Sequence, residues 1–500
     1  MTKNVLNWLE VTSKKYESHI AYKDMNSSIN FKEVMFYSKA IGTALSVVNA
    51  TQPIAVISNR NINTVVAYLG VAYSGHAYAP IDSNLPEQRI HTIMELLKPS
   101  AILVDKANES LAKKLANGLP FFIIEDAINT QADDDVLLSI QRKTLTTDPL
   151  YVIFTSGSTG KPKGVITSHH SLMCYIESYS EVMYIRSDDV LGNQSPLDYI
   201  AAIRDIYLPL YTGCSTVIIP KEYFMQPTQL FDYMNDNLVT SVGWSVSALT
   251  IVSKLNGFKD NKLNTLKKIC FSGSIMPTAC LREWQKNLPD AKFVNQYGPT
   301  EATASCTYYE INRIFSDDEQ IPIGIPYNNY KVFIIKDDLS YAKVGEIGEI
   351  CVSGPALALG YYNDTERTNN SFILNPNNNA FPEKMYRTGD YGRQLENGIL
   401  EFHGRMDRQI KHMGHRVELD EIESAAYRLG SIQECIAIYD KEKEVISLFY
   451  VGNIESKELF VFLKNTIPVF MVPRKIRRVD VLPRLANGKI DMNTLSRCNK

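Results

Sequence analysis

The stretch Thr155-Ser-Gly-Ser-Thr-Gly-Lys-Pro-Lys-Gly164 follows directly on the apolar run Tyr151-Val-Ile-Phe154 and is the most informative part of the 500-residue chain. The apolar run predicts a strand, because β-branched and aromatic residues favour sheets. In the residues that follow, small and hydroxyl side chains leave N–H and O–H donors available to wrap phosphate oxygens. We therefore predict a phosphate-binding loop made by Thr155, Ser156, Gly157, Ser158, Thr159, Gly160, Lys161 and Lys163, in which the two lysines add positive charge.

Two other loop patterns resemble this segment. The segment from Gly157 to Lys161 is too short for the P-loop pattern G-x-x-x-x-G-K-[ST]. Ser158-x-x-Lys161 matches the S-x-x-K pattern of penicillin-binding enzymes, but the chain has no S-D-N or K-T-G partner. On this loop alone, an ordinary flexible turn remains open.

Composition bounds the class of protein. The chain is 45% hydrophobic and long enough for at least two domains, and its net charge is −3 with basic residues scattered along it. We expect no nucleic-acid partner and no membrane partner. The amino terminus lacks an apolar core of signal-peptide length, so a cytoplasmic protein is expected. The eight cysteines form no C-x-x-C pair and are expected to be small buried hydrophobes.

The organisation of the chain predicts mixed sheets covered by helices. Runs such as Thr216 to Ile219 read as strands, and the segments 229–234 and 281–287 have helical periodicity. The Asn/Pro-rich stretch 375–384 reads as a surface loop. Beyond it we expect helices at 419–429 and 456–467 and strands at 434–439 and 445–451. The predicted division is a large α/β domain over 1–403 and a small, mobile α+β domain over 404–500.

Five motifs in order resemble those of the acyl-adenylate-forming (ANL) superfamily, which includes peptide-synthetase adenylation domains, acyl-CoA synthetases and luciferases. The phosphate loop is the first. The others are Asn295-Gln-Tyr-Gly-Pro-Thr-Glu301, Tyr386-Arg-Thr-Gly-Asp390, Gly404-Arg-Met-Asp-Arg-Gln-Ile-Lys411 and Leu482-Pro-Arg-Leu-Ala-Asn-Gly-Lys489. Weaker similar segments lie at 77–90 and 348–363. The resemblance covers nearly the whole chain and implies an AMP-forming acid–thiol ligase.

The resemblance implies a role for each matched residue in binding ATP and Mg²⁺. Glu301 is expected to bind the metal, and Thr300 to lie beside the α-phosphate. Asp390 is expected to accept hydrogen bonds from both ribose hydroxyls, because a carboxylate has two acceptor oxygens. The remaining nucleotide-binding candidates are Asn295, Tyr297 beside adenine, Gly298 and Arg405.

The catalytic lysine and the hinge are expected in the last hundred residues. Lys489 can contact both the substrate carboxylate and a phosphate oxygen, and so offset charge in the transition state. It must leave before a pantetheine arm enters, which implies a rotation of the small domain about Asp407. Gly414 begins the loop expected to line the path of the thiol. Alternatively, Asp407 has no role as a hinge and is simply a solvated charged residue beside Arg405 and Arg408.

The acid pocket departs from the family pattern. Ungapped alignment back from Tyr211-Thr212-Gly213 places Ile200 where amino-acid-activating relatives hold an Asp for the substrate ammonium. Asp198 could substitute if the loop bulges, or could cap a helix over 199–210. The alignment places the other pocket residues at Arg204, Gly243, Cys270, Ser272, Gln296, Ala304 and Ser305.

Arg204 leaves two interpretations open. A buried guanidinium needs a partner, which is either a polar or anionic group of the substrate, together with Gln296, or a protein carboxylate such as Asp205 or Asp198. The first interpretation predicts an acid that lacks the usual α-ammonium or that carries a second polar group.

The acceptor thiol is also predicted. S-G-S-T-G and Y-G-P-T-E are more typical of peptide-synthetase and D-alanyl carrier ligase branches than of CoA ligases. Only eleven residues follow Lys489, so a phosphopantetheine carrier protein is expected to act in trans, as for a freestanding adenylation domain. The alternatives are an acyl-CoA ligase that uses free CoA and, from a different class, a nucleotide-binding regulatory pseudoenzyme.

Overall fold

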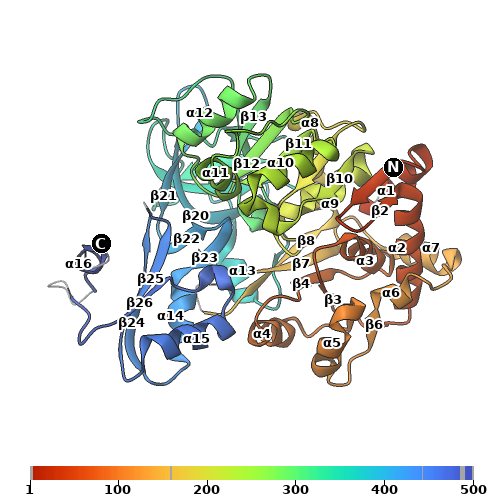
Figure 1. Ribbon diagram of the computed structural model, residues 1–500, viewed down its shortest axis with the longest axis horizontal. Helices are drawn as coiled ribbons and strands as arrows, with labels where there is room; N and C mark the ends of the chain where they lie inside the picture. The colour runs from red at the N-terminus through yellow and green to blue at the C-terminus, as the bar shows by residue number, and fades with distance from the viewer. Residues whose placement is uncertain (1–3, 158–159, 442, 485–489, 498–500) are drawn as a thin grey trace. The chain divides into compact units, whose positions relative to one another are not determined.

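The computed structural model describes residues 4–157, 160–441, 443–484 and 490–497 (Figure 1). The chain forms two compact units. The first comprises Met1–Ser83, Leu97–Ile153 and Gly164–Met406, and the second comprises Asn84–Leu96, Phe154–Lys163 and Asp407–Lys500. The segment of the phosphate loop thus groups with the C-terminal part of the chain, although the sequence placed it in the large domain. The division at 403/404 stays a prediction.

A mixed sheet carries the strand that leads into the phosphate loop. Across the sheet the order is β18 (Gly360–Tyr361), β8 (Lys163–Ser168), β7 (Pro149–Thr155), β4 (Tyr78–Asp82), β3 (Ile54–Ser58), β5 (Ala101–Val104) and β6 (Phe121–Ile123). β4 is parallel to β3 and β7, β5 is parallel to β3 and β6, and β18 is antiparallel to β8. Every residue of β3 is buried, which fits the apolar run over residues 54–57.

A larger sheet carries the predicted acid pocket. Its order is β15 (Ile325–Pro326), β14 (Thr307–Ile311), β13 (Lys292–Tyr297), β12 (Lys268–Ser272), β11 (Ser241–Ser245), β9 (Val190–Asn193), β10 (Ser215–Ile218), β1 (Ile20–Lys23) and β2 (Ser28–Asn30). The strands from β13 to β1 pair in parallel, and β2, β14 and β15 pair antiparallel to their neighbours. The carboxyl ends of β11, β12 and β13 therefore meet at one edge, where α/β proteins bind ligands.

A third sheet completes the first unit and carries the predicted ribose-binding aspartate. It contains β16 (Lys331–Ile335), β17 (Gly348–Ser353), β20 (Lys384–Gln394) and β19 (Phe372–Leu374), with β21 (Leu400–Arg405) paired antiparallel to β20. The predicted loop at 375–384 lies between β19 and β20.

Helices cover the two larger sheets in separate cores (Figure 1). Helices α10 (Pro227–Asp236), α11 (Val246–Lys254) and α12 (Thr278–Asn287) pack on the larger sheet around Trp244 and Trp284, whose rings meet edge to face. A second cluster joins both sheets to α1 (Val5–Lys15), α2 (Phe31–Leu45), α3 (Ile62–Tyr73), α8 (His169–Met183) and α9 (Ile203–Thr212). The other helices of this unit are α5 (Glu109–Ala116), α6 (Ile124–Ala127), α7 (Asp134–Lys143) and α13 (Thr365–Ser371).

The second unit is α+β. A hairpin of β22 (Gln409–His412) and β23 (His415–Glu418) precedes α14 (Leu419–Tyr427), and a separate sheet has the order β24 (Ile432–Asp440), β25 (Val445–Gly452) and β26 (Lys475–Arg478). Its core also includes residues of α15 (Ser456–Thr466). The described residues of this unit also form helices α4 (Glu87–Leu97) and α16 (Met492–Arg497). The predicted fold class, mixed sheets covered by helices, is confirmed.

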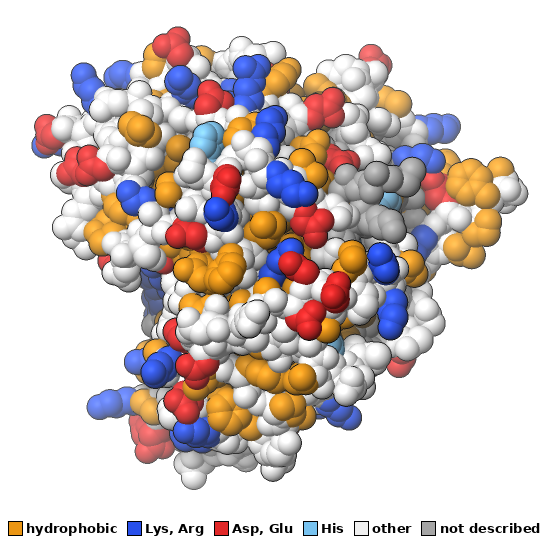
Figure 2. All heavy atoms as spheres, turned by 90° about the vertical axis from the view of Figure 1, so that its right-hand side faces the viewer, with side chains coloured by type: hydrophobic (Ala, Val, Ile, Leu, Met, Phe, Trp, Pro, Cys, Tyr) orange, Lys and Arg blue, Asp and Glu red, His pale blue; other side chains and the backbone are white. Residues whose placement is uncertain are grey.

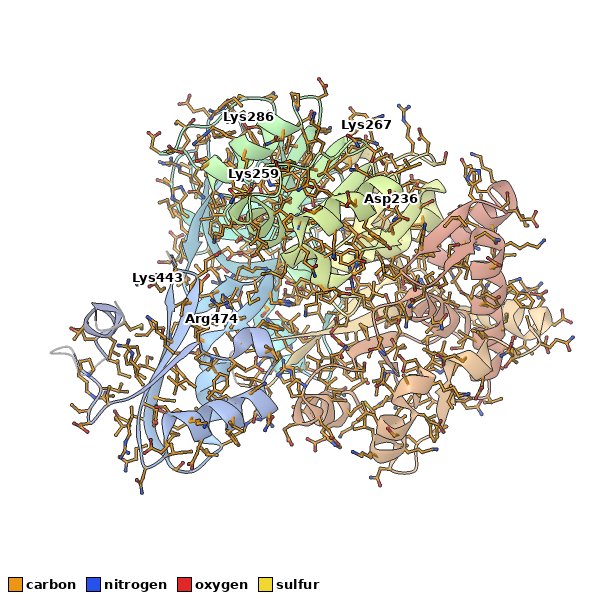
Figure 3. The ribbon with its side chains drawn as sticks, viewed as in Figure 1. Asp236, Lys259, Lys267, Lys286, Lys443 and Arg474 are labelled. Atoms are coloured by element: carbon orange, nitrogen blue, oxygen red, sulfur yellow. The ribbon has the colours of Figure 1, made fainter. Side chains whose placement is uncertain are left out.

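Most charged side chains lie scattered on the surface. On the face shown in Figure 2, basic and acidic side chains alternate with apolar ones. In the first unit Lys259, Lys267 and Lys286 are exposed, as is Asp236 (Figure 3). The seven cysteines that the structure describes are free and buried, as expected for small hydrophobes. Cys498 lies outside the described residues.

Candidate active site

The described part of the predicted phosphate loop contacts the C-terminal segment within the second unit. The Ser156 hydroxyl donates to the Arg416 carbonyl (2.7 Å), and Arg428 Nη2 donates to the Gly160 carbonyl (3.1 Å). Gly160 has φ +75°, a left-handed conformation that favours glycine, and a Cβ there would clash with Ser424. The position therefore needs glycine for both its backbone conformation and its neighbour.

The other loop residues differ in exposure. Lys161 is exposed and Lys163 is half-buried. The Thr155 hydroxyl is buried and has no hydrogen-bond partner among the residues that the structure describes. Such an orphaned donor is rare in native proteins and fits a ligand oxygen. Ser158 and Thr159 lie outside the described residues.

The loop already binds an anionic group of the protein. The Gly157 N–H donates to Glu421 Oε2 (3.2 Å), and Glu421 forms an ion pair with Arg89. The side chain of Glu421 is 1% exposed and that of Arg89 is 10% exposed. A loop N–H that binds a carboxylate can equally bind a phosphate oxygen, so the loop fits ATP.

Three predicted nucleotide residues converge in the first unit. The Tyr297 hydroxyl donates to Asp390 Oδ2 (2.5 Å), and Arg405 forms an ion pair with Asp390 Oδ1. Asp390 and Arg405 face each other across β20 and β21, and the Asp390 N–H donates to the Thr388 hydroxyl (3.0 Å). Burial and the Asp390 carboxylate raise the pKa of Tyr297 well above its usual value, so its hydroxyl stays protonated and remains a donor. Both Asp390 oxygens thus lie among polar groups.

The predicted metal ligand lies on a short turn. Thr300–Ala302 forms a 3₁₀ turn after β13, and Thr300 and Glu301 are both buried. Glu301 Oε1 accepts a hydrogen bond from the Tyr361 hydroxyl (2.7 Å). Among the described residues no group of three or more His, Cys, Asp and Glu side chains could hold a metal by itself. One carboxylate together with substrate phosphates is the usual arrangement for Mg²⁺, so Glu301 fits this metal.

Asn295 and Gly298 have structural partners. Asn295 Nδ2 donates to the Pro322 carbonyl (2.7 Å), and a Cβ at Gly298 would clash with the backbone at Ser305. Both residues lie a few positions before the turn that carries Thr300 and Glu301. Direct contact with a nucleotide stays a prediction for them.

The structure brings most of the predicted acid-pocket residues to one sheet edge. Gly243 pairs with Cys270 across β11 and β12, and Ser272 ends β12. Gln296 lies near the end of β13, and its amide oxygen accepts from the Ser305 hydroxyl (3.4 Å). Ala304, with φ +74°, lies between the turn and Ser305 and packs against the core.

Arg204 has protein partners. It lies on α9, is 2% exposed, and donates through Nη2 to the Gly243 carbonyl. Its Nε lies 3.6 Å from Asp205 Oδ1, and a Cβ at Gly243 would clash with the guanidinium. Of the two interpretations left open by the sequence, pairing with Asp205 is the one the structure contains. Glycine at 243 makes room for this arrangement.

Asp205 belongs to a buried chain of polar contacts. Its Oδ2 accepts from Asn193 Nδ2 (2.8 Å), and Asn193 Oδ1 accepts from Arg60 Nη2 (2.6 Å). Arg60 also donates to the Ser195 carbonyl (3.2 Å) and to the Ile219 carbonyl. Burial lowers the pKa of Arg60 to about 10, so it stays charged at neutral pH. Arg60 thus links the β3–α3 loop to the ends of β9 and β10.

The expected helix cap at Asp198 is wrong. A 3₁₀ turn at Ile200–Ala202 precedes α9, which begins only at Ile203. The N-cap residue of this turn is Tyr199, and no side chain makes a capping hydrogen bond there. Asp198 instead lies near Asp82. Burial, with Asp82 second, raises the pKa of Asp198 to about 7. Ile200 is buried in the apolar core.

The hinge and the thiol-lining loop lie in the second unit. Asp407 Oδ1 accepts from the Gln409 N–H (3.2 Å). Met413 and Gly414, with φ +52° and +81°, form the turn between β22 and β23, as left-handed hairpin turns require. Lys489 lies outside the described residues.

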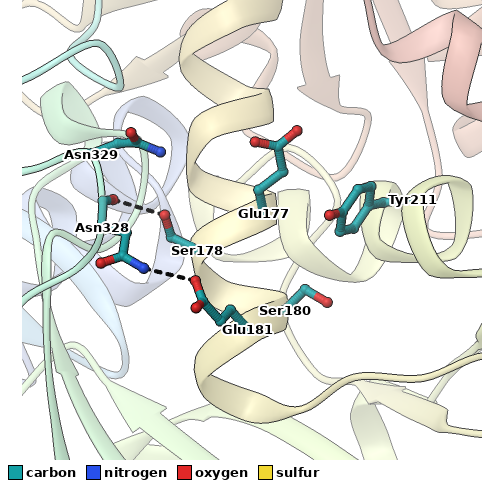
Figure 4. Close-up of a pocket in the computed structure, with 7 residues that line it drawn as sticks. All are labelled: Glu177, Ser178, Ser180, Glu181, Tyr211, Asn328 and Asn329. Atoms are coloured by element: carbon teal, nitrogen blue, oxygen red, sulfur yellow. Dashed lines mark hydrogen bonds between the residues drawn. The ribbon is translucent and has the colours of Figure 1, made fainter. Parts of the chain in front are cut away.

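A pocket of about 400 Å³ in the first unit has none of the predicted site residues in its lining. It is lined by Glu177, Ser178, Ser180, Glu181, Tyr211, Asn328 and Asn329 (Figure 4). Asn328 Nδ2 donates to Glu181 (2.8 Å), and burial raises the pKa of Glu177. Two glutamates in an open pocket do not by themselves define a ligand.

Sequence reasoning missed three residues at these sites, namely Arg89, Tyr361 and Glu421. Arg89 and Tyr361 lie within the weaker family-like segments, which was the only signal for them.

Among the described residues, no helix combines the length and the apolar character that a membrane span requires.

Comparison with known proteins gives two separate matches to family models. The model described as AMP-binding enzyme matches residues 9–362, and the model described as AMP-binding enzyme C-terminal domain matches residues 421–489. Bacitracin synthase 1 of Bacillus licheniformis is 31% identical over 95% of this chain, and tyrocidine synthase 2 of Brevibacillus parabrevis is 28% identical over 97%. The chain spans only 9% and 13% of these two relatives.

Solved structures share the fold. The adenylation domain AlmE of Vibrio cholerae, in complex with glycyl-adenosine-5'-phosphate, has a TM-score of 0.86 at 20% identity and covers 100% of this chain and 98% of its own. Holo-PA1221, which contains adenylation and PCP domains, has a TM-score of 0.84 at 22% identity, covering 99% and 84%.

Proposed function

Because the chain belongs to the AMP-binding enzyme family and is an AMP-forming ligase, we propose that it uses ATP and Mg²⁺ to activate a small carboxylic acid and then loads it on a carrier protein. The chain is an adenylation domain of the peptide-synthetase type, which forms an acyl adenylate. The metal is proposed to be Mg²⁺, the substrate a small carboxylic acid, and the acceptor a carrier protein. We also propose that the protein is cytoplasmic, as expected from the sequence.

The observation that carries the proposal is the convergence of Tyr297, Asp390 and Arg405. Tyr297 lies 93 residues before Asp390 and Arg405 lies 15 residues after it, yet the three form one hydrogen-bonded group around the Asp390 carboxylate. A carboxylate held in this way can accept both ribose hydroxyls, and the tyrosine ring offers a flat apolar surface beside it. This arrangement supports binding of the adenosine part of ATP.

The chemistry is assigned to three further groups. Glu301 would hold a magnesium ion, which would supply positive charge to offset that of the phosphates. Thr155 and Gly157 would donate to phosphate oxygens, since one hydroxyl lacks a partner among the described residues and one N–H already binds a carboxylate. Lys489 would stabilise the charge that develops as the acid attacks the α-phosphorus, which is worth a few kcal/mol.

The acid is proposed to lack the α-ammonium of ordinary amino-acid substrates. Ile200 is buried among apolar residues, and isoleucine cannot bind an ammonium. Because Asp205 already offsets the charge of Arg204, a neutral polar group near Arg204 and Gln296 fits better than a second carboxylate. Equal turnover of D-alanine by the wild type and Arg204→Ala would contradict this part of the proposal.

The acceptor is proposed to be a phosphopantetheine thiol on a separate carrier protein. The proposed movement rotates residues 404–500 about Asp407, so that Lys489 leaves before the thiol enters and Gly414 lines its path. The support is the similarity to peptide-synthetase adenylation domains and to a structure that contains adenylation and PCP domains.

A thioester assay tests the proposal. The enzyme, ATP and a panel of amino, hydroxy, aryl and fatty acids are incubated with either a phosphopantetheinylated carrier or free CoA, and products are identified by intact mass. We expect acylated carrier and little acyl-CoA. Acyl-CoA alone would make the chain a CoA ligase, and neither product with any acid would favour the regulatory pseudoenzyme.

A further inference from the structure

The turn that carries Glu301 is held by a neighbouring segment, residues 354–361. The Ala358 N–H donates to the Glu301 carbonyl (2.8 Å). The Thr303 hydroxyl donates to the Ala356 carbonyl (2.6 Å). Because both contacts involve backbone groups, they fix the path of the turn but not the direction of the Glu301 side chain.

Tyr361 contacts that side chain directly. Its hydroxyl donates to Glu301 Oε1 over 2.7 Å, and the side chains lie in a buried setting, with Glu301 0% exposed and Tyr361 5% exposed. A hydroxyl donor satisfies one carboxylate oxygen but brings no positive charge. This contact therefore orients the carboxylate without adding a positive charge beside it.

Tyr361 is itself tied to the strand that leaves the phosphate loop. It pairs with Val165 of β8, and the N–H of the next residue, Tyr362, donates to the Gly164 carbonyl (2.8 Å). The Tyr361 N–H also donates to the Thr368 hydroxyl (2.9 Å). The side chain that orients Glu301 is thus held in register with the residues just after the loop.

We infer that Tyr361 is the positioning residue that fixes the Glu301 carboxylate relative to β8, and thereby sets the affinity of the site for the divalent cation that accompanies ATP. The inference rests on the proposed role of Glu301 as metal ligand. Tyr361 acts through Glu301, so it would not contact the substrate or the reacting atoms.

The test compares Tyr361→Phe with Tyr330→Phe. Both substitutions remove one buried hydroxyl from the same aromatic cluster, but the Tyr330 hydroxyl donates to the backbone carbonyl of Ala302 (3.1 Å). Binding of Mn²⁺ to each protein with a non-hydrolysable ATP analogue is measured by electron paramagnetic resonance. A hydrogen bond to a charged group is lost only in Tyr361→Phe, so we expect its Mn²⁺ dissociation constant to rise roughly tenfold, while Tyr330→Phe stays within about twofold of the wild type.

A kinetic readout separates positioning from general damage. In Tyr361→Phe the Mg²⁺ concentration for half-maximal pyrophosphate release should rise by a similar factor, while the KM for the acid stays unchanged. Unchanged Mn²⁺ affinity in Tyr361→Phe, or equal loss in both variants, would overturn the inference. Wild-type Mn²⁺ affinity in Glu301→Gln would instead overturn the proposed role of Glu301, so the two failures are distinguishable.

Discussion

Two arginine–aspartate pairs in the first unit show opposite designs. Arg405–Asp390 lies on paired strands, with side chains 17% and 10% exposed, and Tyr297 also donates to its carboxylate. Arg204–Asp205 is 2% and 3% exposed and is held by Asn193 and the Gly243 carbonyl. The partly exposed pair Arg405–Asp390 can exchange a protein partner for a ligand. The fully buried pair Arg204–Asp205, called the sealed pair below, holds its neighbours in place.

The largest effect is expected from Asp205→Ala. Removal of this carboxylate leaves the buried Arg204 charge without its partner, so the free energy of unfolding should fall by about 3–5 kcal/mol. Urea denaturation measures it. The exposed pair Arg282–Asp317, with Asp317 81% exposed, provides the control, since Asp317→Ala should cost less than about 1 kcal/mol. An equal loss of unfolding free energy in both variants would show that burial of the pair makes no difference to its contribution.

Asp390→Asn tests the accessible pair. The variant should fold, because the amide keeps the shape and one acceptor oxygen. Its kcat/KM for ATP should fall about 100-fold, because charge-assisted bonds to the ribose are weakened. Pyrophosphate release at varied ATP measures the effect, and the KM for the acid should hardly change. A wild-type kcat/KM for ATP would mean that this pair is structural as well.

Gly243→Ala perturbs the sealed pair from the other side. The new methyl group would clash with the Arg204 guanidinium, which should destabilise the fold by about 1–3 kcal/mol. Because Arg204 must shift, the KM for the acid should change more than the KM for ATP. Steady-state kinetics with each substrate varied measures this, and an equal change in both KM values would argue against a place for Gly243 in the acid pocket.

Asp198→Asn should have an effect that depends on pH. The folded-state pKa of Asp198, about 7, lies above its ordinary value of 3.8. Between these values the folded state binds more protons than the unfolded state, so its contribution to stability falls as pH rises, by up to about 1.4 kcal/mol per unit. Asp198→Asn should therefore gain stability relative to the wild type between pH 5 and 7. A difference that is constant with pH in urea titrations would contradict this.

Local sequence predicted the fold class, and it supplied most residues of the proposed nucleotide site. Apolar runs gave the strands around Tyr151 and Thr216, and the helices at 419–427 and 456–466 lie where periodicity placed them. The phosphate loop and the residues near Glu301 and Asp390 were found because each motif is contiguous in the chain. The structure then adds the contacts between these motifs, such as Tyr297 with Asp390.

Partner choice could not be predicted from sequence, because it depends on long-range packing. Sequence left open whether Arg204 pairs with the substrate or with a protein carboxylate. The structure pairs it with Asp205 and with the carbonyl of the distant Gly243. Asp198 precedes a helical pattern as a cap would, but the chain passes through a 3₁₀ turn first. Tyr361 and Glu301 are 60 residues apart, so no local pattern announces their hydrogen bond.

Direct detection of the acyl adenylate tests the central claim. The wild type and Lys489→Ala are incubated with ATP, Mg²⁺ and the acid panel, and the bound products are identified by mass spectrometry. We expect one acid to give an acyl-AMP species with stoichiometric pyrophosphate in the wild type, reduced at least 100-fold in Lys489→Ala. Equal acyl-AMP in both proteins would contradict the assigned role of Lys489, and no acyl-AMP with any acid would contradict the proposed activation of a small carboxylic acid.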